Sequence, residues 1–513
     1  MSAVRVADVL ASLSMVADLG FGLPPGEALT SCVIATGLAR HLGLAESDVG
    51  DAFYTALLEH VGCVGFAHEA AALLGDELRV GAAAAVTNDS RTLDALVGFH
   101  RRATQGMPVV PRIQAVARSL RRGQAGGREL ATAACEVGSA TARRIGLPPG
   151  VQRGLNEVFE SWAGTDGAQR LRGDDIALAA RIARVSAVAA RFHDMGGTDA
   201  SIRAVRERSG GVLDPAIADA LATHAATLLA PLDAGDPLVT VMDIEPEPHR
   251  SIPTHRLAEL AAAFGDLADL KAPFLHGHSA GVERLTRDAA QRLGLAPAAT
   301  ARLSLAALLH DMGRIGIPDS VWERPGPLTA PQWEQVRMHP YHSERVVARS
   351  RTLAPLAPIV GMHHERLDGS GYHRGSRARD IPREARILAV ADAFDAMTHP
   401  RPHRDALSPE GAAEQLRAEV RAGRLDAAAT TAILASVGST DRLRRPALPA
   451  GLTDREVEVL RAMAAGLGNR EVGELLAISA RTAEHHVQHV YGKIGVSSRA
   501  AAALFAMEHG LLD

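Results

Sequence analysis

The chain has 513 residues, a formal net charge of −4 and 47% hydrophobic residues, so it can bury a sizeable core, and its overall charge indicates no class of partner. Aromatic residues make up only 3%, and a core of Ala and Leu is more easily built from helices than from strands. The N-terminus lacks the basic start and apolar run of a signal peptide, and no apolar span predicts a membrane helix. Because Cys32, Cys63 and Cys135 are scattered, we expect no disulfide framework and a cytoplasmic protein.

Apolar residues recur at three- and four-residue spacing over most of the chain, which predicts an all-α protein. Two segments rich in proline and charge, 243–255 and 440–451, are predicted to be linkers. We therefore expect three domains, over residues 1–240, 256–440 and 448–513.

The first two predicted domains resemble each other. With a shift of 251 positions, residues 40–66 align with 291–317 without a gap, and with a shift of 205, residues 176–187 align with 381–392. The first alignment matches Leu-Gly-Leu-Ala, Ala-Leu-Leu and two glycines. We expect one helical fold used twice; a chance match between Ala- and Leu-rich helices is the alternative.

The two copies differ where ligand-type side chains stand. With the second copy first, the facing residues are His310 and Glu59, Asp311 and His60, Arg314 and Cys63, His278 and Glu27, Asp392 and Ala187, His363 and Val158, and His364 and Phe159. Apolar framework positions persist while candidate ligands are lost. We therefore expect the first copy to be non-catalytic and to serve as a sensor, a dimer surface or a scaffold.

The second copy concentrates imidazoles and carboxylates in short motifs. These are HGHS (276–279), LLHD (308–311), MHPYH (338–342), GMHHERLDGSGYH (361–373) and AVADAFDAMT (389–398). Any one of them could be a helix cap or a surface pair, whereas their combination predicts a metal site. Imidazoles together with carboxylates suit Fe, Mn or Zn better than Ca.

These motifs, together with HDMGRIGIPD (310–319), resemble the HD-GYP family of metal-dependent phosphohydrolases over about residues 270–435. The resemblance implies a helical bundle with a centre of two or three metal ions, commonly Fe or Mn, and hydrolysis of cyclic di-GMP as the best-known activity. It also implies that Asp311 bridges two ions. The metal ligands it implies are His278, His310, Asp311, His339, His363, His364 and Asp392.

The expected chemistry is hydrolysis of a phosphodiester, whose negative charge repels hydroxide. Two ions lower the pKa of a shared water and neutralise the phosphate oxygens. Arg314 stands where the family usually has Lys, and we expect it to act with Asp311 in catalysis by stabilising developing charge. Arg314, Asp368 and Tyr372 are the expected substrate contacts; a surface role for the arginine and loop-shaping roles for the other two are the alternatives.

The chain departs from the family pattern at three positions. His373 replaces the Pro of the GYP motif and Arg314 replaces Lys, which puts specificity for cyclic di-GMP in doubt. Phe274 stands where some members with three metals carry an extra Glu. We therefore expect two divalent ions, Fe or Mn.

The C-terminal tail, from residue 451 onward, is predicted to form four helices. Thr453 and Glu456 make a capping box, Ser479 caps the third helix, and Gly495 ends it. The tight turn before Ser479 indicates a helix-turn-helix.

The tail resembles the LuxR-type DNA-binding domain over its full length. The resemblance implies that the third helix packs on the core through Val487, Val490, Tyr491 and Ile494. The residues it implies for DNA contact are Arg481, Thr482, His485, Gln488 and His489, with Lys493 on a phosphate. Because residues 450–513 hold six Lys and Arg against eight Asp and Glu, a protein-binding bundle is the alternative. If the tail binds DNA, we expect strong salt dependence and a need for dimers.

Together these features predict a transcription regulator whose middle domain hydrolyses a phosphodiester such as a cyclic dinucleotide. Its expected partners are double-stranded DNA, a nucleotide or other phosphodiester, and a second copy of the chain, with no membrane. One alternative keeps the metal and the pocket as a ligand sensor without turnover. Another is an enzyme whose tail only contacts partner proteins.

Overall fold

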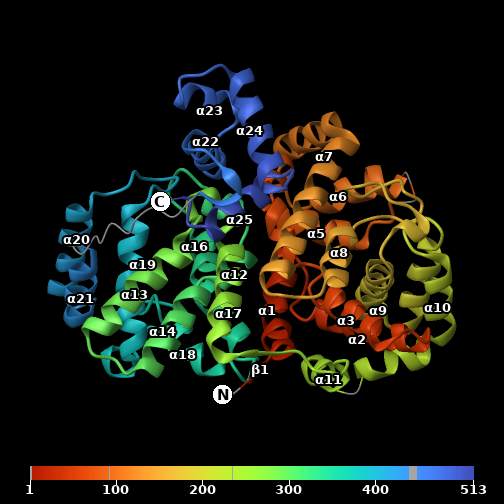
Figure 1. The fold of residues 1–513 in the computed structure, drawn as a ribbon, viewed down its shortest axis with the longest axis horizontal. Coiled ribbons are helices and arrows are strands. Elements are labelled where there is room, and N and C mark those ends of the chain that lie inside the picture. Colours follow the sequence, from red (N-terminus) through yellow and green to blue (C-terminus); the bar gives the residue numbers. More distant parts are fainter. Residues whose placement is uncertain (1–2, 90, 92, 234, 438–447, 513) are drawn as a thin grey trace. The chain divides into compact units, whose positions relative to one another are not determined.

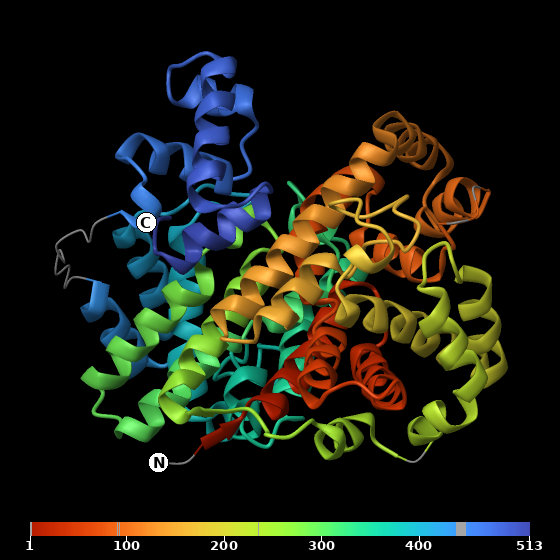
Figure 2. The same ribbon diagram turned by 45° about the vertical axis from the view of Figure 1, so that its right-hand side comes forward.

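The computed structural model describes residues 3–89, 91, 93–233, 235–437 and 448–512. The chain divides into two compact units, 1–254 and 255–513, and each is built from helices (Figures 1 and 2), so the predicted all-α fold is confirmed. Among the described residues, the strands β1 (Ala3–Arg5) and β2 (Ser251–Pro253) pair antiparallel and join the two ends of the first unit.

The first unit runs from red to yellow-green in Figure 1, and its long helix α7 is the extended orange helix of Figure 2. Its helices are α1 (Val6–Gly20), α2 (Glu27–His41), α3 (Glu46–Leu57), α4 (Ala67–Leu74), α5 (Glu77–Val86), α6 (Phe99–Ala103), α7 (Val109–Arg144), α8 (Pro149–Glu157), α9 (Leu178–Arg208), α10 (Pro215–Leu229) and α11 (Pro237–Ile244).

The second unit begins with the bundle that carries the predicted ligands. Its helices are α12 (Leu257–Asp269), α13 (His278–Arg292), α14 (Pro297–Leu309), α15 (Asp319–Trp322), α16 (Ala330–Arg337), α17 (His339–Val347), α18 (Ala357–Gly361), α19 (Arg383–Thr398), α20 (Pro409–Arg421) and α21 (Ala427–Val437). Most of the second predicted linker, 440–451, lies outside the described residues.

The two units repeat helices at the offsets that the sequence predicts. α2 and α13 begin 251 positions apart, and α9 and α19 begin 205 positions apart. The fall in offset from 251 to 205 means that the first unit holds 46 additional residues after its 3₁₀ turn η1 (Val61–Phe66). These additional residues account for most of α4, α5, α6 and the start of α7.

A buried aspartate anchors the start of the equivalent helix in each unit. Asp18 accepts a hydrogen bond from the backbone N–H of Ala28 at 3.3 Å, and Asp269 accepts one from the backbone N–H of Ser279 at 2.8 Å. The anchor persists although the first helical residue differs, since α13 opens with His278 and α2 with a glutamate. The two units therefore share this anchor although the side chains at the start of the helix differ.

The four helices predicted for the tail are present, and they enclose a core of their own. They are α22 (Asp454–Ala464), α23 (Asn469–Leu475), α24 (Ala480–Ile494) and α25 (Arg499–Glu508). Thr453 and Glu456 form the predicted capping box. Ser479 caps α24 by accepting from the backbone of its first turn, and Gly495 ends it in the left-handed region at φ 71°.

All three cysteines are buried free thiols. Among the described residues, no single helix has the length and apolar composition needed to cross a membrane. One pair bent by 41°, Glu46–Leu57 with Val61–Leu74, meets those two criteria together.

The close approach of η1 to α7 provides a test of the repeated framework. A Cβ on Gly62 would lie 1.9 Å from the carbonyl oxygen of Ala134, whereas one on Gly50 in α3 would meet nothing within 4 Å. We expect Gly62→Ala to lower the free energy of local opening by about 1–3 kcal/mol, because backbone must shift. Gly50→Ala, the control, should be neutral or raise that free energy by roughly 0.5–1 kcal/mol.

Hydrogen–deuterium exchange in peptides from α3 and the second half of α7 measures both effects. Equal protection of the two variants would contradict the packing described for η1.

Candidate metal centre and DNA-binding helix

Two groups of potential metal ligands lie in the second unit, and they share one residue. The first is Asp311, His339, His363 and His364, and the second is His278, His310, Asp311 and Asp392. Within each group, one ligand atom per residue lies within 4.8 Å of the others. All seven ligands predicted from the sequence thus come together, and Asp311 belongs to both groups.

Most of these side chains stand at the ends of helices that converge inside the bundle. α13 packs against α14 and α19, and the 3₁₀ turn η7 (Met312–Gly316) packs against α17. His278 opens α13, His310 and Asp311 follow α14, His339 opens α17, His363 and His364 follow α18, and Asp392 lies within α19. A bundle therefore brings together ligands that are far apart in the sequence.

Backbone carbonyls fix the orientation of three imidazoles. His310, His339 and His363 each donate from Nδ1 to the carbonyl oxygen three residues earlier, at 2.7, 2.6 and 2.6 Å. With the proton on Nδ1, the Nε2 atom of each ring presents a lone pair to Asp311, whose carboxylate lies 3.1–3.5 Å away. This is the arrangement by which proteins orient metal-binding histidines.

The inward-facing atoms fit a metal centre, because they lack other partners. Nε2 of His339 lies 3.3 Å from Nε2 of His363, and since both Nδ1 atoms carry protons, two lone pairs face each other. Within the described part of the chain, Nε2 of His278 and His310 and Oδ1 of Asp311 are buried without a hydrogen-bond partner, and Oδ2 of Asp311 forms an ion pair with Arg314. A cation among these atoms would satisfy all of them.

The charges around the centre favour the ligand forms of Asp311 and His339. Burial opposes ionisation of Asp311, but Arg314 at 2.9 Å and the His310 imidazole hold its pKa well below its usual range. Burial lowers the pKa of His339 to about 4, so this ring is neutral at pH 7. An ionised carboxylate and neutral imidazoles are the forms that bind metals. For His310, burial favours the neutral ring, but the Asp311 and Asp392 carboxylates raise its pKa to about 9, so a bound cation would have to displace this proton.

The three predicted substrate residues lie in different surroundings. Arg314 is 7% exposed and lies over the Trp322 ring at 5.2 Å from its centroid. Tyr372 stacks on the His364 ring at 4.7 Å between centroids. Asp368, in contrast, is exposed and accepts from the backbone N–H of Ser370, so the structure does not bring it to the ligand groups.

Two residues beside the centre were not assigned from the sequence. Asp395 accepts from Nδ1 of His278 at 2.6 Å and so orients that ring; its position one helical turn after Asp392 was an available signal. The Arg401 guanidinium lies over the Phe274 ring at 5.1 Å. Burial lowers the Arg401 pKa to about 10, and the neighbouring Arg314 charge adds to this effect. No motif marks Arg401 in the sequence.

In the first unit, ion pairs occupy the positions of the ligands. Nδ1 of His60 lies 2.8 Å from Asp18, and Arg191 lies 3.3 Å from Glu27, the residue that replaces His278. Burial raises the Glu59 pKa to about 8, so this carboxyl is neutral at pH 7. Among the described residues of this unit alone, no three potential ligands form a metal-binding group. In the first unit, the Arg191 guanidinium thus neutralises a carboxylate at a position where the second unit has a candidate metal ligand.

On α24, the residues predicted to contact DNA form an exposed face. Val487 and Val490 are buried in the tail's core, and Tyr491 and Ile494 pack against it, as predicted. The exposed residues are Arg481, Thr482, His485, Gln488 and His489.

Lys493 has a different environment from the rest of the predicted DNA-contacting set. Its ammonium donates to the Glu456 carboxylate at 2.6 Å and to the Gly451 carbonyl at 2.9 Å. These contacts join the end of α24 to the start of α22, so the charge is already engaged within the domain.

Comparison with known families supports both sites. Residues 262–429 match the HD domain family, and residues 450–506 match the bacterial regulatory proteins of the luxR family. The chain carries an HD domain followed by a LuxR-type DNA-binding domain. The homologues of its HD domain are cyclic dinucleotide phosphodiesterases.

One relative resembles the chain along most of its length. The 3'3'-cGAMP-specific phosphodiesterase 3 of Vibrio cholerae is 29% identical over 407 residues, which cover 78% of this chain and 88% of the relative. A crystal structure titled as a cyclic GMP-AMP specific phosphodiesterase of V. cholerae has a TM-score of 0.59 at 25% identity, covering 88% of this chain and all of that one.

A second relative matches a shorter part of the chain. The cyclic di-GMP phosphodiesterase response regulator of Xanthomonas campestris is 42% identical over 148 residues, which cover 28% of this chain and 39% of the relative.

Proposed function

We propose that the second unit hydrolyses a cyclic dinucleotide with two divalent cations and that the LuxR-type domain binds double-stranded DNA. The observation that supports hydrolysis most is the sharing of Asp311 between two complete ligand groups. One carboxylate between two sets of imidazole and carboxylate donors suits a pair of Fe or Mn ions. The predicted boundaries, 1–240, 256–440 and 448–513, are part of this proposal.

When bound, a pair of divalent ions activates a water and neutralises phosphate charge. The chain's own cations then hold the substrate. Nε of Arg314 is buried and has no partner within the described chain, although another nitrogen of the same guanidinium pairs with Asp311. A phosphate oxygen is the acceptor that this N–H requires. Arg401 adds a second guanidinium near Arg314 and Asp392.

For the substrate, we favour a mixed cyclic GMP-AMP over cyclic di-GMP. The relative that aligns with both units is named for 3'3'-cGAMP. His373 also stands in place of the Pro of the family's GYP motif, beside the Tyr372 that stacks on a ligand histidine. A sensor that binds the same nucleotide without turnover is the alternative.

Hydrolysis is tested with 3'3'-cGAMP, cyclic di-GMP and bis(p-nitrophenyl) phosphate in the presence of Mn²⁺ or Fe²⁺. We expect metal-dependent turnover that Asp311→Ala abolishes, because both ligand groups lose their shared member. Arg314→Gln should lower kcat by about 10²-fold, since a charge-stabilising donor is lost, and Arg314→Lys should restore part of it.

Arg421→Gln, a change of an exposed arginine on α20, is the control and should leave turnover unchanged. Absence of metal-dependent turnover with all three substrates would reject the enzyme and leave the sensor.

For DNA binding, we propose that α24 enters the major groove with Arg481, His485, Gln488 and His489 toward the bases and the backbone. Thr482 also contributes, from the capped first turn. In this proposal Lys493 acts mainly by holding the domain together through Glu456. Because the tail carries more acidic than basic residues, we infer that a homodimer is needed for specific binding.

DNA binding is tested by fluorescence anisotropy with genomic fragments that the wild-type chain selects. We expect Arg481→Ala with Gln488→Ala to weaken binding at least tenfold, since a good base contact is worth about 1–3 kcal/mol. The double change should also flatten the salt dependence if Arg481 contacts a phosphate.

Lys493→Met is the matched comparison. It should lower the melting temperature of the tail, because the contact with Glu456 is lost, and should leave the salt dependence of DNA binding nearly unchanged. Wild-type affinity and salt dependence in the double variant would show that α24 is not the recognition helix.

A further inference from the structure

A cavity of about 290 Å³ in the first unit is lined in part by residues that stand at two of the ligand positions of the second unit. One wall comes from the additional residues of this unit, including Val80 and Phe99, and the other comes from the repeated framework. Ala134 and Phe159 in this wall stand at the positions of the ligands His339 and His364 in the second unit, 205 residues later. Part of the cavity wall therefore corresponds to ligand positions of the second unit's candidate metal site.

Four phenylalanine rings line this cavity. Phe21 lies 6.2 Å from Phe66 and 6.4 Å from Phe159, between ring centroids, and Phe99 completes the aromatic lining. Leu130 and several alanines add apolar surface. Such a surface suits a flat apolar ligand, because rings stack or meet edge to face at these distances.

The cavity also contains a buried donor that lacks an acceptor. Arg184 on α9 lines the cavity with its guanidinium 5.8 Å from the Phe159 ring centroid. Its Nε atom is buried, and within the described chain it has no hydrogen-bond partner. In the second unit the equivalent position, 205 residues later, is Ala389, so this arginine belongs to the first unit's cavity alone. Nearby Arg191 is different, because it already pairs with Glu27.

We propose that this cavity binds a small, planar, apolar carboxylate, with its ring system among the phenylalanines and its carboxylate on Arg184. A carboxylate accepts two parallel hydrogen bonds from a guanidinium, which supplies the acceptor that Nε lacks. Asp89 and Asp166 also line the cavity and would repel an anionic ligand, but burial raises the Asp89 pKa, which lessens this repulsion. Arg128 adds a second guanidinium to the lining. The first unit would then be a ligand receptor, and this inference does not rest on hydrolysis in the second unit.

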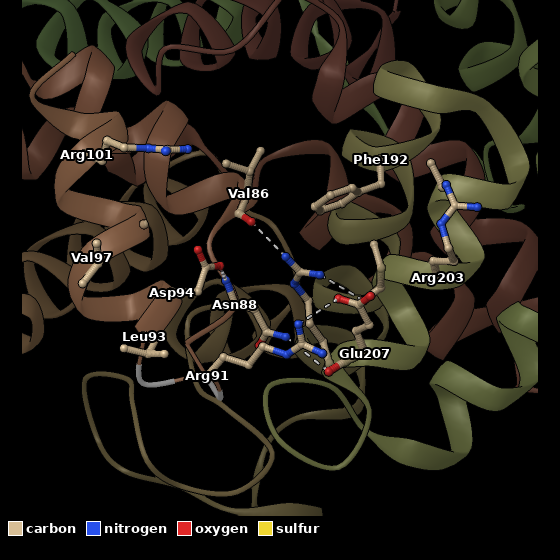
Figure 3. Close-up of a pocket in the computed structure, with 14 residues that line it drawn as sticks. Val86, Asn88, Arg91, Leu93, Asp94, Val97, Arg101, Phe192, Arg203 and Glu207 are labelled. Atoms are coloured by element: carbon tan, nitrogen blue, oxygen red, sulfur yellow. Dashed lines mark hydrogen bonds and ion pairs between the residues drawn. The ribbon is translucent and has the colours of Figure 1, made fainter.

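A larger cleft in the same unit, of about 1080 Å³, fits such a ligand less well (Figure 3). Arg208 in this cleft already donates to the carbonyl oxygens of Val86 and Ala204 and lies over the Phe192 ring at 4.7 Å. Arg91 in turn lies 3.8 Å from Glu207. Its inner cations are therefore engaged, and this cleft provides the control arginine, Arg203, which is exposed at its edge.

The test is calorimetric titration of the full chain with three probes of the same shape. These are 2-naphthoate, the neutral 2-naphthalenemethanol and the cationic 2-naphthylmethylamine. We expect the carboxylate to bind most tightly and the amine most weakly. Arg184→Gln should weaken 2-naphthoate about tenfold and leave the alcohol nearly unchanged, because only the charged contact is lost. Arg203→Gln should change neither.

Two variants fill the cavity in different ways. Ala131→Trp and Ala85→Leu replace half-buried alanines of its lining. Circular dichroism first shows whether each variant folds. Each folded variant should then bind none of the three probes. The proposal is overturned if the wild-type chain binds none of the probes. It is also overturned if the amine binds as tightly as the carboxylate, or if both filled variants bind 2-naphthoate as the wild type does.

Discussion

The structure of the second unit depends on a set of ligand atoms that the protein itself does not satisfy. Three imidazoles have their Nδ1 protons committed to backbone carbonyls, so their Nε2 lone pairs converge on one another and on the Asp311 carboxylate. Burying such groups without partners is unfavourable by about 1–3 kcal/mol each. Divalent cations held by these atoms would make this arrangement favourable and would supply the chemistry for hydrolysing a phosphodiester.

Among its described residues, the first unit has ion pairs where the second unit has the candidate ligands. Its framework keeps the aspartate anchor at the start of α2, but guanidinium charge from Arg191 now faces Glu27. The buried carboxyl of Glu59 is neutral, because burial raises its pKa to about 8. Because these ion pairs need no metal ion, the neighbouring cavity can be lined by apolar side chains. On the two proposals made above, the same bundle supports hydrolysis in one copy and ligand recognition in the other.

Much of the fold could be predicted from the sequence, because helical periodicity, capping residues and the two repeat offsets are local or aligned signals. The seven candidate ligands, which the structure brings together, could also be named in advance, because motifs such as LLHD and MHPYH resemble those of the HD-GYP family. Arg401 was not, because it reaches the centre through the packing of its side chain on Phe274 rather than through any motif. The engagement of Lys493 by Glu456 was hidden for the same reason: the two residues are 37 positions apart and meet only through the tertiary fold. The difference between the two alignment offsets already reveals the additional 46 residues. Only the structure shows that some of them line a cavity.

The most direct test is the metal content of the purified full-length chain, measured by inductively coupled plasma mass spectrometry beside Asp311→Ala. If Asp311 joins two ligand groups, the wild-type chain holds two transition-metal ions and the variant loses both, while Glu59→Ala in the first unit changes nothing. A wild-type chain that holds no ion after loading with Fe²⁺ or Mn²⁺, or a variant that keeps two, would contradict the shared centre.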